Sequence, residues 1–569
     1  MTHRGLRMIL VSAALVATTL PSLASFPGIV AQISAVAESS AASSSDIRSD
    51  FNGDGYEDLA ISAPEEDIGS TKNAGVVHIL YGSSSGLQIT SPADQLWSQD
   101  SPGVEDVAEE GDRFGMSLAA GDFNDDGFDD LATGAPWENS ATRNNPGVVN
   151  VLYGSASGLQ ASAPADQLWS QDSPGVEDTG QFNDFFGGSV AASDFNGDGF
   201  DDLAVGVDHE SVGSISGAGA THILYGSSLG LQTSSPVDQY WTQNSPGVSD
   251  AAEAGDTFGG TLAGGDFNND GYADLAIGGS GSNILGNLGI GAGAESVGTV
   301  TFAGAVNILY GSASGLRASA SGTTPDDQFW HQNSPGVDDV VEERDFFGSS
   351  LAIGDFNGDA FEDLAIGVFE EDIGGIGRGG AVHVLYGSSV GLRTSSPADQ
   401  FWNQNSPGVE GAVENFDSFG ASTGTGDFNN DGFDDLAIGA PRGYTSSPTW
   451  PGEANVLYGS SSGLQTSSPS DQLWTQDSPS VEDTAENHDD FGSFVTAGDF
   501  NGDGHADLAI AAVTEAVGTK PEAGAVNVLY GSSAFGLQTS SPVDQFWNQD
   551  TPGVEENAVG YDLFGYSLG

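Results

Sequence analysis

One nine-residue acidic segment occurs seven times in this chain, at nearly constant spacing. Five of the six intervals between copies are 72 residues long, and the fourth interval is 89. A fixed period of this length is typical of repeat architectures, in which each unit buries its apolar face only against its neighbours. The chain is therefore expected to fold as seven similar units, and the segments begin at Asp50, Asp122, Asp194, Asp266, Asp355, Asp427 and Asp499.

Each repeat contains four short β-like segments bounded by turn residues, without helical periodicity. In the second repeat they are 114–118, 130–136, 148–154 and the Asp-Gln-x-Trp segment Asp166–Trp169. Four strands per repeat, repeated radially, is the pattern of a β-propeller. We predict an all-β fold, a seven-bladed β-propeller of four-stranded antiparallel blades.

The two ends of the chain hold complementary parts of one repeat. A Phe-Gly pair precedes the acidic segment by eight residues in repeats two to seven, whereas Ala42 occupies that place in the first repeat. The missing pair is found at the far end, as Phe564-Gly565. We predict that this C-terminal strand pairs with the first blade and closes the ring, which leaves no long edge unpaired. The alternative is a fragment of a longer repeat array.

The acidic segment brings oxygen-bearing side chains to alternate positions around a sharp turn. Position one is Asp, three is Asn, five and nine are Asp, and six is Gly in six copies. Together with the carbonyl at position seven, these groups suit a hard cation with six or seven oxygen ligands, and Ca²⁺ fits better than Mg²⁺. We predict about seven Ca²⁺ sites; the alternative is a solvated turn rich in Asx residues.

The predicted ligands follow from these positions. The side-chain ligands are Asp50, Asn52, Asp54, Asp58, Asp122, Asn124, Asp126, Asp130, Asp194, Asn196, Asp198, Asp202, Asp266, Asn268, Asp270, Asp274, Asp355, Asn357, Asp359, Asp363, Asp427, Asn429, Asp431, Asp435, Asp499, Asn501, Asp503 and Asp507. The carbonyl ligands belong to Tyr56, Phe128, Phe200, Tyr272, Phe361, Phe433 and His505. We expect the fifth site to be the weakest, because Ala360 replaces the turn glycine.

Composition excludes several classes of partner. The chain has 12 basic and 81 acidic residues, a formal charge of -69, so nucleic acid and anionic membranes are poor partners. It contains no cysteine, which excludes disulfides, thiol nucleophiles and thiolate metal sites.

The N-terminus has the pattern of an export signal. Basic residues precede the apolar run 8–20, and small residues follow it. The run is shorter than the ~20 residues of a transmembrane helix, which is the alternative. We expect a signal peptide at 1–24, an Ala/Ser-rich linker at 25–45 and the propeller at 46–569. The mature protein is then secreted, extracellular or periplasmic, without membrane insertion.

The motifs resemble the FG-GAP repeat family, the module of the integrin α-chain N-terminal β-propeller. Its Phe-Gly, acidic-loop and Gly-Ala-Pro elements match Phe114-Gly115, Asp122–Asp130 and Gly134-Ala135-Pro136 in that order. Gly-Ala-Pro is complete only in repeats two and six. The resemblance covers roughly 46–569 and implies Ca²⁺ ligation at each loop. A cysteine-free chain is similar to the secreted bacterial type, so an integrin-type heterodimer is not assumed.

Departures from the seven-fold pattern are the first candidates for ligand binding. Repeat four has a Gly-rich insertion near Gly279–Val300. Repeats two and six place tryptophans near cations, Trp137 with Arg143, and Trp450 with Arg442 and Tyr444. Such pairs suit a glycan or protein site; ordinary loop packing is the alternative. The acidic stretch after each Asp-Gln-x-Trp segment, such as 105–112, is interpreted as a solvated loop, with extra cation binding as the alternative.

These observations favour a secreted calcium-binding module for interaction or cell adhesion, with an extracellular protein or polysaccharide as partner. An enzyme needs an asymmetric set of acid, base or nucleophile. Here the carboxylates are symmetric metal ligands, and no Gly-x-Ser-x-Gly or His-Glu-x-x-His motif stands out from the repeats. We therefore expect no enzymatic activity. The alternatives are a glycan-active hydrolase or lyase with its site over the propeller channel, and a purely structural surface protein.

Overall fold

The computed structural model describes residues 49–140, 142–281, 293–319, 325–443 and 450–569. The predicted signal peptide and linker lie outside these residues and stay predictions. The chain divides into two units, Met1–Ala42 and Ser43–Gly569, and only the second contains described residues. The described part is all-β, so it contains no helix capable of crossing a membrane.

Seven antiparallel sheets make up most of the described part of the second unit. The first is β1 (Leu59–Ala63), β2 (Val76–Leu80) and β3 (Gln95–Trp97); the second is β4 (Leu118–Gly121), β5 (Asp130–Ala135), β6 (Val148–Leu152) and β7 (Gln167–Trp169); the third is β8 (Val190–Ser193), β9 (Asp202–Val207), β10 (Ala220–Leu224) and β11 (Gln239–Trp241). The fourth is β12 (Thr261–Gly265), β13 (Asp274–Gly278), β16 (Val306–Leu309) and β17 (Gln328–Trp330); the fifth is β18 (Leu351–Gly354), β19 (Asp363–Val368), β20 (Ala381–Leu385) and β21 (Gln400–Trp402). The sixth is β22 (Ser422–Gly426), β23 (Asp435–Ala440), β24 (Glu453–Leu457) and β25 (Gln472–Trp474); the seventh is β26 (Phe491–Gly498), β27 (Asp507–Ala512), β28 (Ala525–Leu529) and β29 (Gln545–Trp547).

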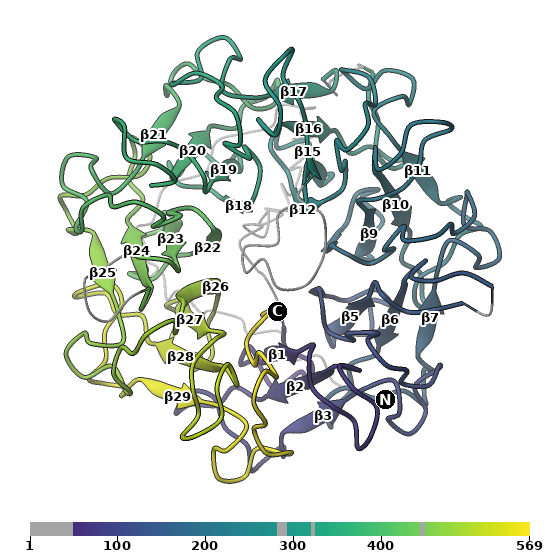
Figure 1. The fold of residues 1–569 in the computed structure, drawn as a ribbon, viewed down its shortest axis with the longest axis horizontal. Coiled ribbons are helices and arrows are strands. Elements are labelled where there is room, and N and C mark those ends of the chain that lie inside the picture. The colour runs from purple at the N-terminus through teal and green to yellow at the C-terminus, as the bar shows by residue number, and fades with distance from the viewer. Residues whose placement is uncertain (1–48, 141, 282–292, 320–324, 444–449) are drawn as a thin grey trace, which may run out of the picture. The chain divides into compact units, whose positions relative to one another are not determined.

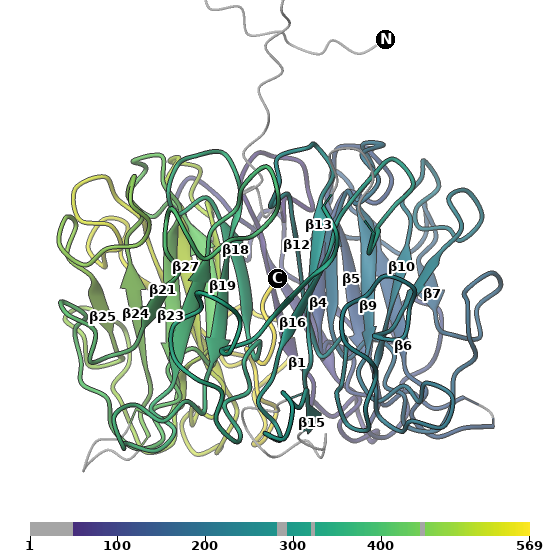
Figure 2. The same ribbon diagram turned by 90° about the horizontal axis from the view of Figure 1, so that it is seen from above.

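The sheets are the blades of a seven-bladed β-propeller, as predicted. Figure 1 shows them around a common axis, with β12, β18, β22 and β26 innermost and the short Gln-x-Trp strands at the periphery. Figure 2 shows the same blades from the side, with connecting loops at both ends of the strands. The insertion in the fourth blade begins with a short ladder between β14 (Ser280–Gly281) and β15 (Gly293–Ala294), and its residues 282–292 lie outside the described part.

The C-terminal residues complete the first blade, which confirms the predicted closure. The Ala60 amide donates to the Gly569 carbonyl at 2.7 Å, and the Gly569 amide donates back to the Ala60 carbonyl at 3.1 Å. The Ser62 amide donates to the Ser567 carbonyl at 3.0 Å. The C-terminus accordingly lies beside β1 in Figure 1.

The cores lie between blades rather than within them. Seven hydrophobic clusters each join two neighbouring blades, because both faces of every sheet are apolar. Close approach needs a small residue at one point: a Cβ added to Gly134 would lie 2.1 Å from the Gly187 carbonyl oxygen of the next blade. The glycine in the second strand therefore permits backbone contact between blades.

Candidate metal centres

The seven acidic segments, called the acidic loops below, all lie on one face of the propeller. Each connects the innermost strand of its blade to the second strand, so position nine opens strands such as β5. Since neighbouring strands are antiparallel, the connections between second and third strands, and those from the fourth strand to the next blade, lie on the opposite face. We call the two sides the acidic-loop face and the opposite face.

Backbone amides hold the carboxylates of each acidic loop. In the first loop the Asp50 carboxylate accepts the amides of Asp54 at 3.1 Å and Gly55 at 2.8 Å. The Asp54 carboxylate accepts the Tyr56 amide at 3.1 Å. The same bonds recur in the other six loops, which gives the loops one shared conformation.

The carboxylate at position nine ties the loop to the rest of its blade. Asp58 is fully buried, and it accepts the amides of Phe51 at 3.0 Å and Gly82 at 2.9 Å. The Asn52 side-chain amide also donates to it, at 3.3 Å. Gly82 follows the third strand, so a single carboxylate joins the loop to two strands of the blade. The bonds from the asparagine and from this glycine recur in all seven blades.

Hydrogen bonds also join each acidic loop to the next, and they run around the whole ring. The amide at position eight donates to the carbonyl of position one in the preceding loop, as Asp129 does to Asp50 at 3.2 Å. The seventh such bond closes the ring, from Glu57 to Asp499 at 3.3 Å. Five loops add a side-chain bond, because position eight is acidic there and accepts the amide of position one, as Glu57 does from Asp499 at 2.8 Å. Sequence reasoning missed position eight.

Two turn positions in each loop adopt a left-handed backbone. Position six has positive φ, including Ala360 at 68°, where the other loops have glycine. The glycines there have an open space at Cβ or a neighbour no closer than 3.3 Å, so alanine adds backbone strain and no clash. Position four also has positive φ in every loop. Its residues are Gly, Asp or Asn throughout, a signal that the sequence interpretation did not use.

The acidic loops concentrate negative charge in a confined space. Burial, with added repulsion from Asp50 and Asp54, raises the pKa of Asp58 to about 9. The pKa of Asp130 is also raised to about 9 by burial, with repulsion from Asp122 and Asp126. A bound cation would relieve this repulsion, so the electrostatics of the loop fit a cation site.

The residue types of the acidic loop fit Ca²⁺, but the carboxylate oxygens of one loop lie farther apart than they would around a bound ion. Each carboxylate oxygen has two lone pairs, so bonds to amides leave acceptor capacity for a metal. The three carboxylates of one loop do not bring their oxygens within 4.8 Å of one another; among the described residues, three groups on the opposite face do so. The asparagine presents its nitrogen to position nine, and ligation by its oxygen requires the amide to turn over. The individual predicted ligands therefore stay predictions.

Trp137, one of the two tryptophans singled out from the sequence, contacts a different arginine from the one predicted. Trp137 lies under the Arg113 guanidinium at 4.4 Å from the ring centre and packs against Phe185, whereas Arg143 pairs with Asp172. Trp450 packs edge-on against His488, with ring centres 4.8 Å apart. Tyr444 lies outside the described residues. The pairing of Trp137 with Arg143 was wrong because Arg113 comes from a different loop of the same face.

The stretch after each Asp-Gln-x-Trp segment is only partly solvated, which corrects a second interpretation. Several of its residues are exposed, but Asp112 at its end is fully buried. The Asp and Gln of the Asp-Gln-x-Trp segment also connect blades: Asp166 accepts the Glu105 amide, and the Gln95 side chain bonds Leu159 of the next blade at 3.0 Å. These contacts bring distant segments together, which local sequence does not reveal.

A channel of about 370 Å³ lies at the propeller axis and is lined by all seven blades. Among the described residues, its lining consists mainly of small, hydroxyl and aliphatic side chains of the innermost strands, with one carboxylate, Asp208, and one phenol, Tyr566.

Comparisons with known proteins agree with this architecture. The FG-GAP repeat model matches residues 43–80, 114–152, 186–224, 258–306, 347–385, 419–455 and 491–529. Phosphatidylinositol-glycan-specific phospholipase D of Rattus norvegicus is 35% identical over 156 residues, 27% of this chain and 17% of that protein. Integrin alpha-PS5 of Drosophila melanogaster is 32% identical over 162 residues, 28% of this chain and 14% of that protein.

These matches concern less than a fifth of each relative's length. Among solved structures, the "Structure of Dos1 propeller" aligns over 80% of this chain and 78% of that chain, with a TM-score of 0.36 and 12% identity, too low to carry an argument. The order of the Phe-Gly pair, acidic loop and Gly-Ala-Pro-like strand, repeated in seven blades and matched by seven family segments, gives the assignment. The chain belongs to the FG-GAP repeat family.

Proposed function

We propose that this propeller is an extracellular interaction module that binds a protein or polysaccharide and is stabilised by Ca²⁺ at its seven acidic loops. The observation that carries the proposal is the closed ring of hydrogen bonds between consecutive acidic loops. A cation bound in one loop would also stabilise the adjacent loop, because the amide at position eight donates to the carbonyl of position one in the preceding loop.

The acidic loops would hold Ca²⁺ through Asp at positions one, five and nine, Asn at three and the carbonyl at seven. Ca²⁺ supplies positive charge against carboxylates that otherwise repel one another. The Asp at position nine would couple metal binding to the stability of the blade. Its carboxylate also accepts the amide of the glycine that follows the third strand, as Asp58 does from Gly82. The metal therefore has a structural role in this proposal.

The opposite face is the better candidate for binding a partner. Seven of the nine described Lys and Arg residues lie on its connections: Lys72, Arg113, Arg143, Arg344, Arg378, Arg442 and Lys520. Exposed aromatic side chains accompany them, namely Phe182 at 65%, Phe416 at 44% and Tyr561 at 59% exposure. The Arg378 guanidinium lies 5.4 Å from the Phe416 ring centre. Aromatic and Arg side chains are enriched at binding sites.

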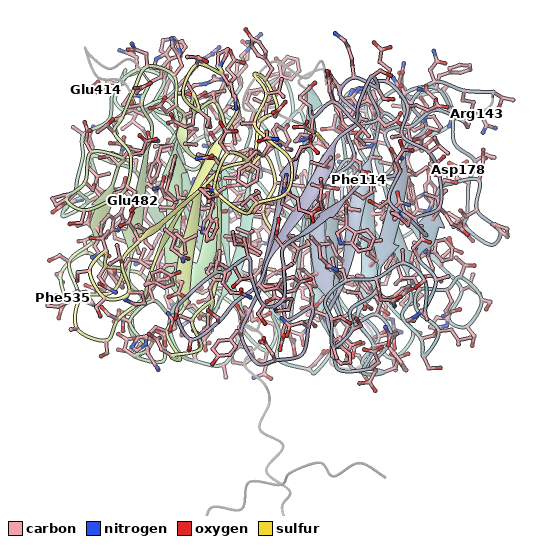
Figure 3. All side chains as sticks on the ribbon, turned by 90° about the horizontal axis from the view of Figure 1, so that it is seen from below. Phe114, Arg143, Asp178, Glu414, Glu482 and Phe535 are labelled. Carbon is pink, nitrogen blue, oxygen red and sulfur yellow. The ribbon has the colours of Figure 1, made fainter. Side chains whose placement is uncertain are left out.

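The two faces are separated by the length of the strands. In Figure 3, Arg143 and Glu414 lie toward one rim and Phe535 lies toward the other. Variants on the two faces can therefore test the proposal independently. The channel, with one carboxylate and one phenol in its lining, gives no reason to add a catalytic role.

Binding to glycan and extracellular-protein arrays, with Ca²⁺ and with chelator, tests the proposal. We expect Phe182→Ser, Phe416→Ser and Tyr561→Ser together to abolish binding at unchanged melting temperature. The matched control is Leu229→Ser, Val390→Ser and Phe535→Ser, because these exposed residues lie on the acidic-loop face where four other repeats have serine. Binding lost only in the control set would contradict the assigned face. Turnover of a bound glycan by the purified protein would contradict the non-enzymatic role.

A further inference from the structure

A second set of buried carboxylates recurs on the opposite face, at the interfaces between blades. An Asp stands two residues before the Phe of every Phe-Gly pair, and each is at most 2% exposed: Asp112, Asp184, Asp256, Asp345, Asp417, Asp489 and Asp562. Each accepts the amide of the residue three positions earlier, as Asp112 does from Glu109 at 2.5 Å. These residues belong to no acidic loop.

A buried glutamine from the preceding blade faces each of these places. The glutamine two residues after each Gln-x-Trp tryptophan is at most 3% exposed and donates its Nε2 to a glutamate of the next blade, as Gln99 does to Glu138 at 2.8 Å. Its Oε1 is buried without a hydrogen-bond partner in all seven copies: Gln99, Gln171, Gln243, Gln332, Gln404, Gln476 and Gln549. At the first interface Oδ1 of Asp112 is also buried and unpartnered. A buried oxygen acceptor without a donor is costly, so these atoms point to an absent positive group.

Five interfaces have a glutamate three residues before this Asp, and at three of them its carboxylate lies close to the other two. The carboxylate oxygens of each group lie within 4.8 Å of one another, and two of its three residues are buried. Within the described part of the chain, none of the nine carboxylates forms an ion pair with Lys, Arg or His. The groups are Glu109–Asp112–Glu138, Glu342–Asp345–Glu371 and Glu486–Asp489–Glu515.

We propose that these three groups are divalent-cation sites, distinct from the acidic loops, and that Ca²⁺ is the cation that fits them. Three carboxylates and the unpartnered glutamine oxygen provide hard oxygen ligands from two neighbouring blades. Each site clamps the connection leaving one blade to a connection of the next. The inference does not depend on the acidic loops binding metal.

The other four interfaces differ in the residue three positions before the Asp or in its placement. Glu253 and Glu414 stand there at two of them, but among the described residues three carboxylates lie within 4.8 Å of one another only at the three interfaces named above. At the interface of the second and third blades, Gln181 stands in the place of Glu109, and its Nε2 donates to Glu210 at 2.6 Å. The side-chain amide of Gln181 thus places a hydrogen-bond donor next to Glu210, where the proposed cation would lie at the three proposed sites. At the interface of the seventh and first blades, Val559 occupies the same place. Asp178, from the same connection as Gln181, and Glu414, from the interface of the fifth and sixth blades, are seen in the upper part of Figure 3.

The test compares Ca²⁺ stoichiometry in the full chain by equilibrium dialysis at millimolar free Ca²⁺. The triple variant Glu109→Gln, Glu342→Gln and Glu486→Gln should bind three fewer Ca²⁺ per chain than the native protein. Glutamine is the residue that the same fold accommodates at 181, so the variant is expected to fold. The reciprocal variant Gln181→Glu should bind one more Ca²⁺ than the native protein.

The proposal is tested by the difference in Ca²⁺ stoichiometry between the variants and the native protein. This difference does not depend on how many Ca²⁺ ions the acidic loops bind. An equal stoichiometry in the native, triple and Gln181→Glu proteins would overturn it and would assign the carboxylates a shared proton instead. Asp130→Asn, in the second acidic loop, is the independent check on the proposed function: it should lower the stoichiometry without changing the difference of three. If the triple variant does not fold, the single variant Glu342→Gln and the gain in Gln181→Glu carry the same test.

Discussion

The two faces of the propeller repeat to different degrees. On the acidic-loop face, seven loops share one conformation, one set of amide bonds and one chain of links to their neighbours. On the opposite face the buried Asp and Gln recur seven times, whereas the third carboxylate, the cations and the exposed aromatic residues differ from blade to blade. A scaffold function demands the same residues in every blade, while recognition of an asymmetric partner demands that they differ.

Removal of Ca²⁺ is the strongest test of this contrast. Chelator should lower the melting temperature markedly and open the acidic loops first to protease. A ligand that binds only the folded state at 100-fold above its Kd contributes about 2.7 kcal/mol per site, and there are seven loops. Differential scanning calorimetry with limited proteolysis measures both effects. Mg²⁺ should restore less stability than Ca²⁺, and an unchanged melting temperature in chelator would refute a structural role for the loops.

The metal-free protein should lose stability as pH rises, because buried carboxylates on both faces have raised pKa values. Burial raises the pKa of Glu210 to about 8 and that of Glu295 to about 8. Raised pKa values mean that the folded state binds more protons, so their stabilisation is complete below the ordinary glutamate pKa and is lost as pH rises through about 8.

Thermal unfolding in chelator between about pH 5 and 9 measures this slope. Glu210→Gln should flatten it, since that group then no longer titrates. A melting temperature that rises over the same range would contradict the assignment.

The links between acidic loops can be tested at the place where the ring closes. Glu57→Ala removes the acceptor for the Asp499 amide and should lower the free energy of unfolding by about 1–2 kcal/mol. Glu57→Gln keeps an acceptor and should cost less. Two loops naturally lack this acceptor, with Ala273 and Ala506 at position eight, so Ala273→Asp should stabilise the protein. Chemical denaturation measures the free energy of unfolding of the three variants. An equal decrease in both Glu57 variants would show that the hydrogen bond to the Asp499 amide does not stabilise the protein.

The smallest expected effect concerns the one irregular acidic loop. Ala360 has φ of 68° where the other loops have glycine. Ala360→Gly should relieve about 1 kcal/mol of backbone strain and strengthen the fifth site by no more than several-fold. Isothermal titration with Ca²⁺ measures the affinity, and Gly432→Ala in the sixth loop should produce the reverse change. Seven equal sites in the native protein would show that the alanine does not matter.

Much of the fold could be predicted because it is encoded locally and repeated. The Phe-Gly pair, the acidic segment and the Gln-x-Trp strand each mark one strand, and the displaced copy at Phe564 identified the closing strand. Gly134 is also part of the repeated motif, and its lack of a side chain permits the close approach of the Gly187 carbonyl of the next blade.

What could not be predicted depends on contacts between distant segments. Gln99, Asp112 and Glu138 meet only because two blades pack together. Their periodicity was visible, since the Asp before each Phe-Gly pair is present in all seven repeats, but periodicity alone does not distinguish a buried carboxylate from a solvated one. The partner of Trp137 was misassigned for the same reason.

The pairing of residues 567–569 with β1 has a consequence for biosynthesis. Six blades can assemble in order as the polypeptide emerges, yet the innermost position of the first blade stays vacant until residues 567–569 fill it. A nascent chain that stalls before them presents β1 as a bare edge, open to pairing with a foreign strand. Ring formation in this protein thus depends on joining Ser62 to Ser567, two residues 505 positions apart in the chain.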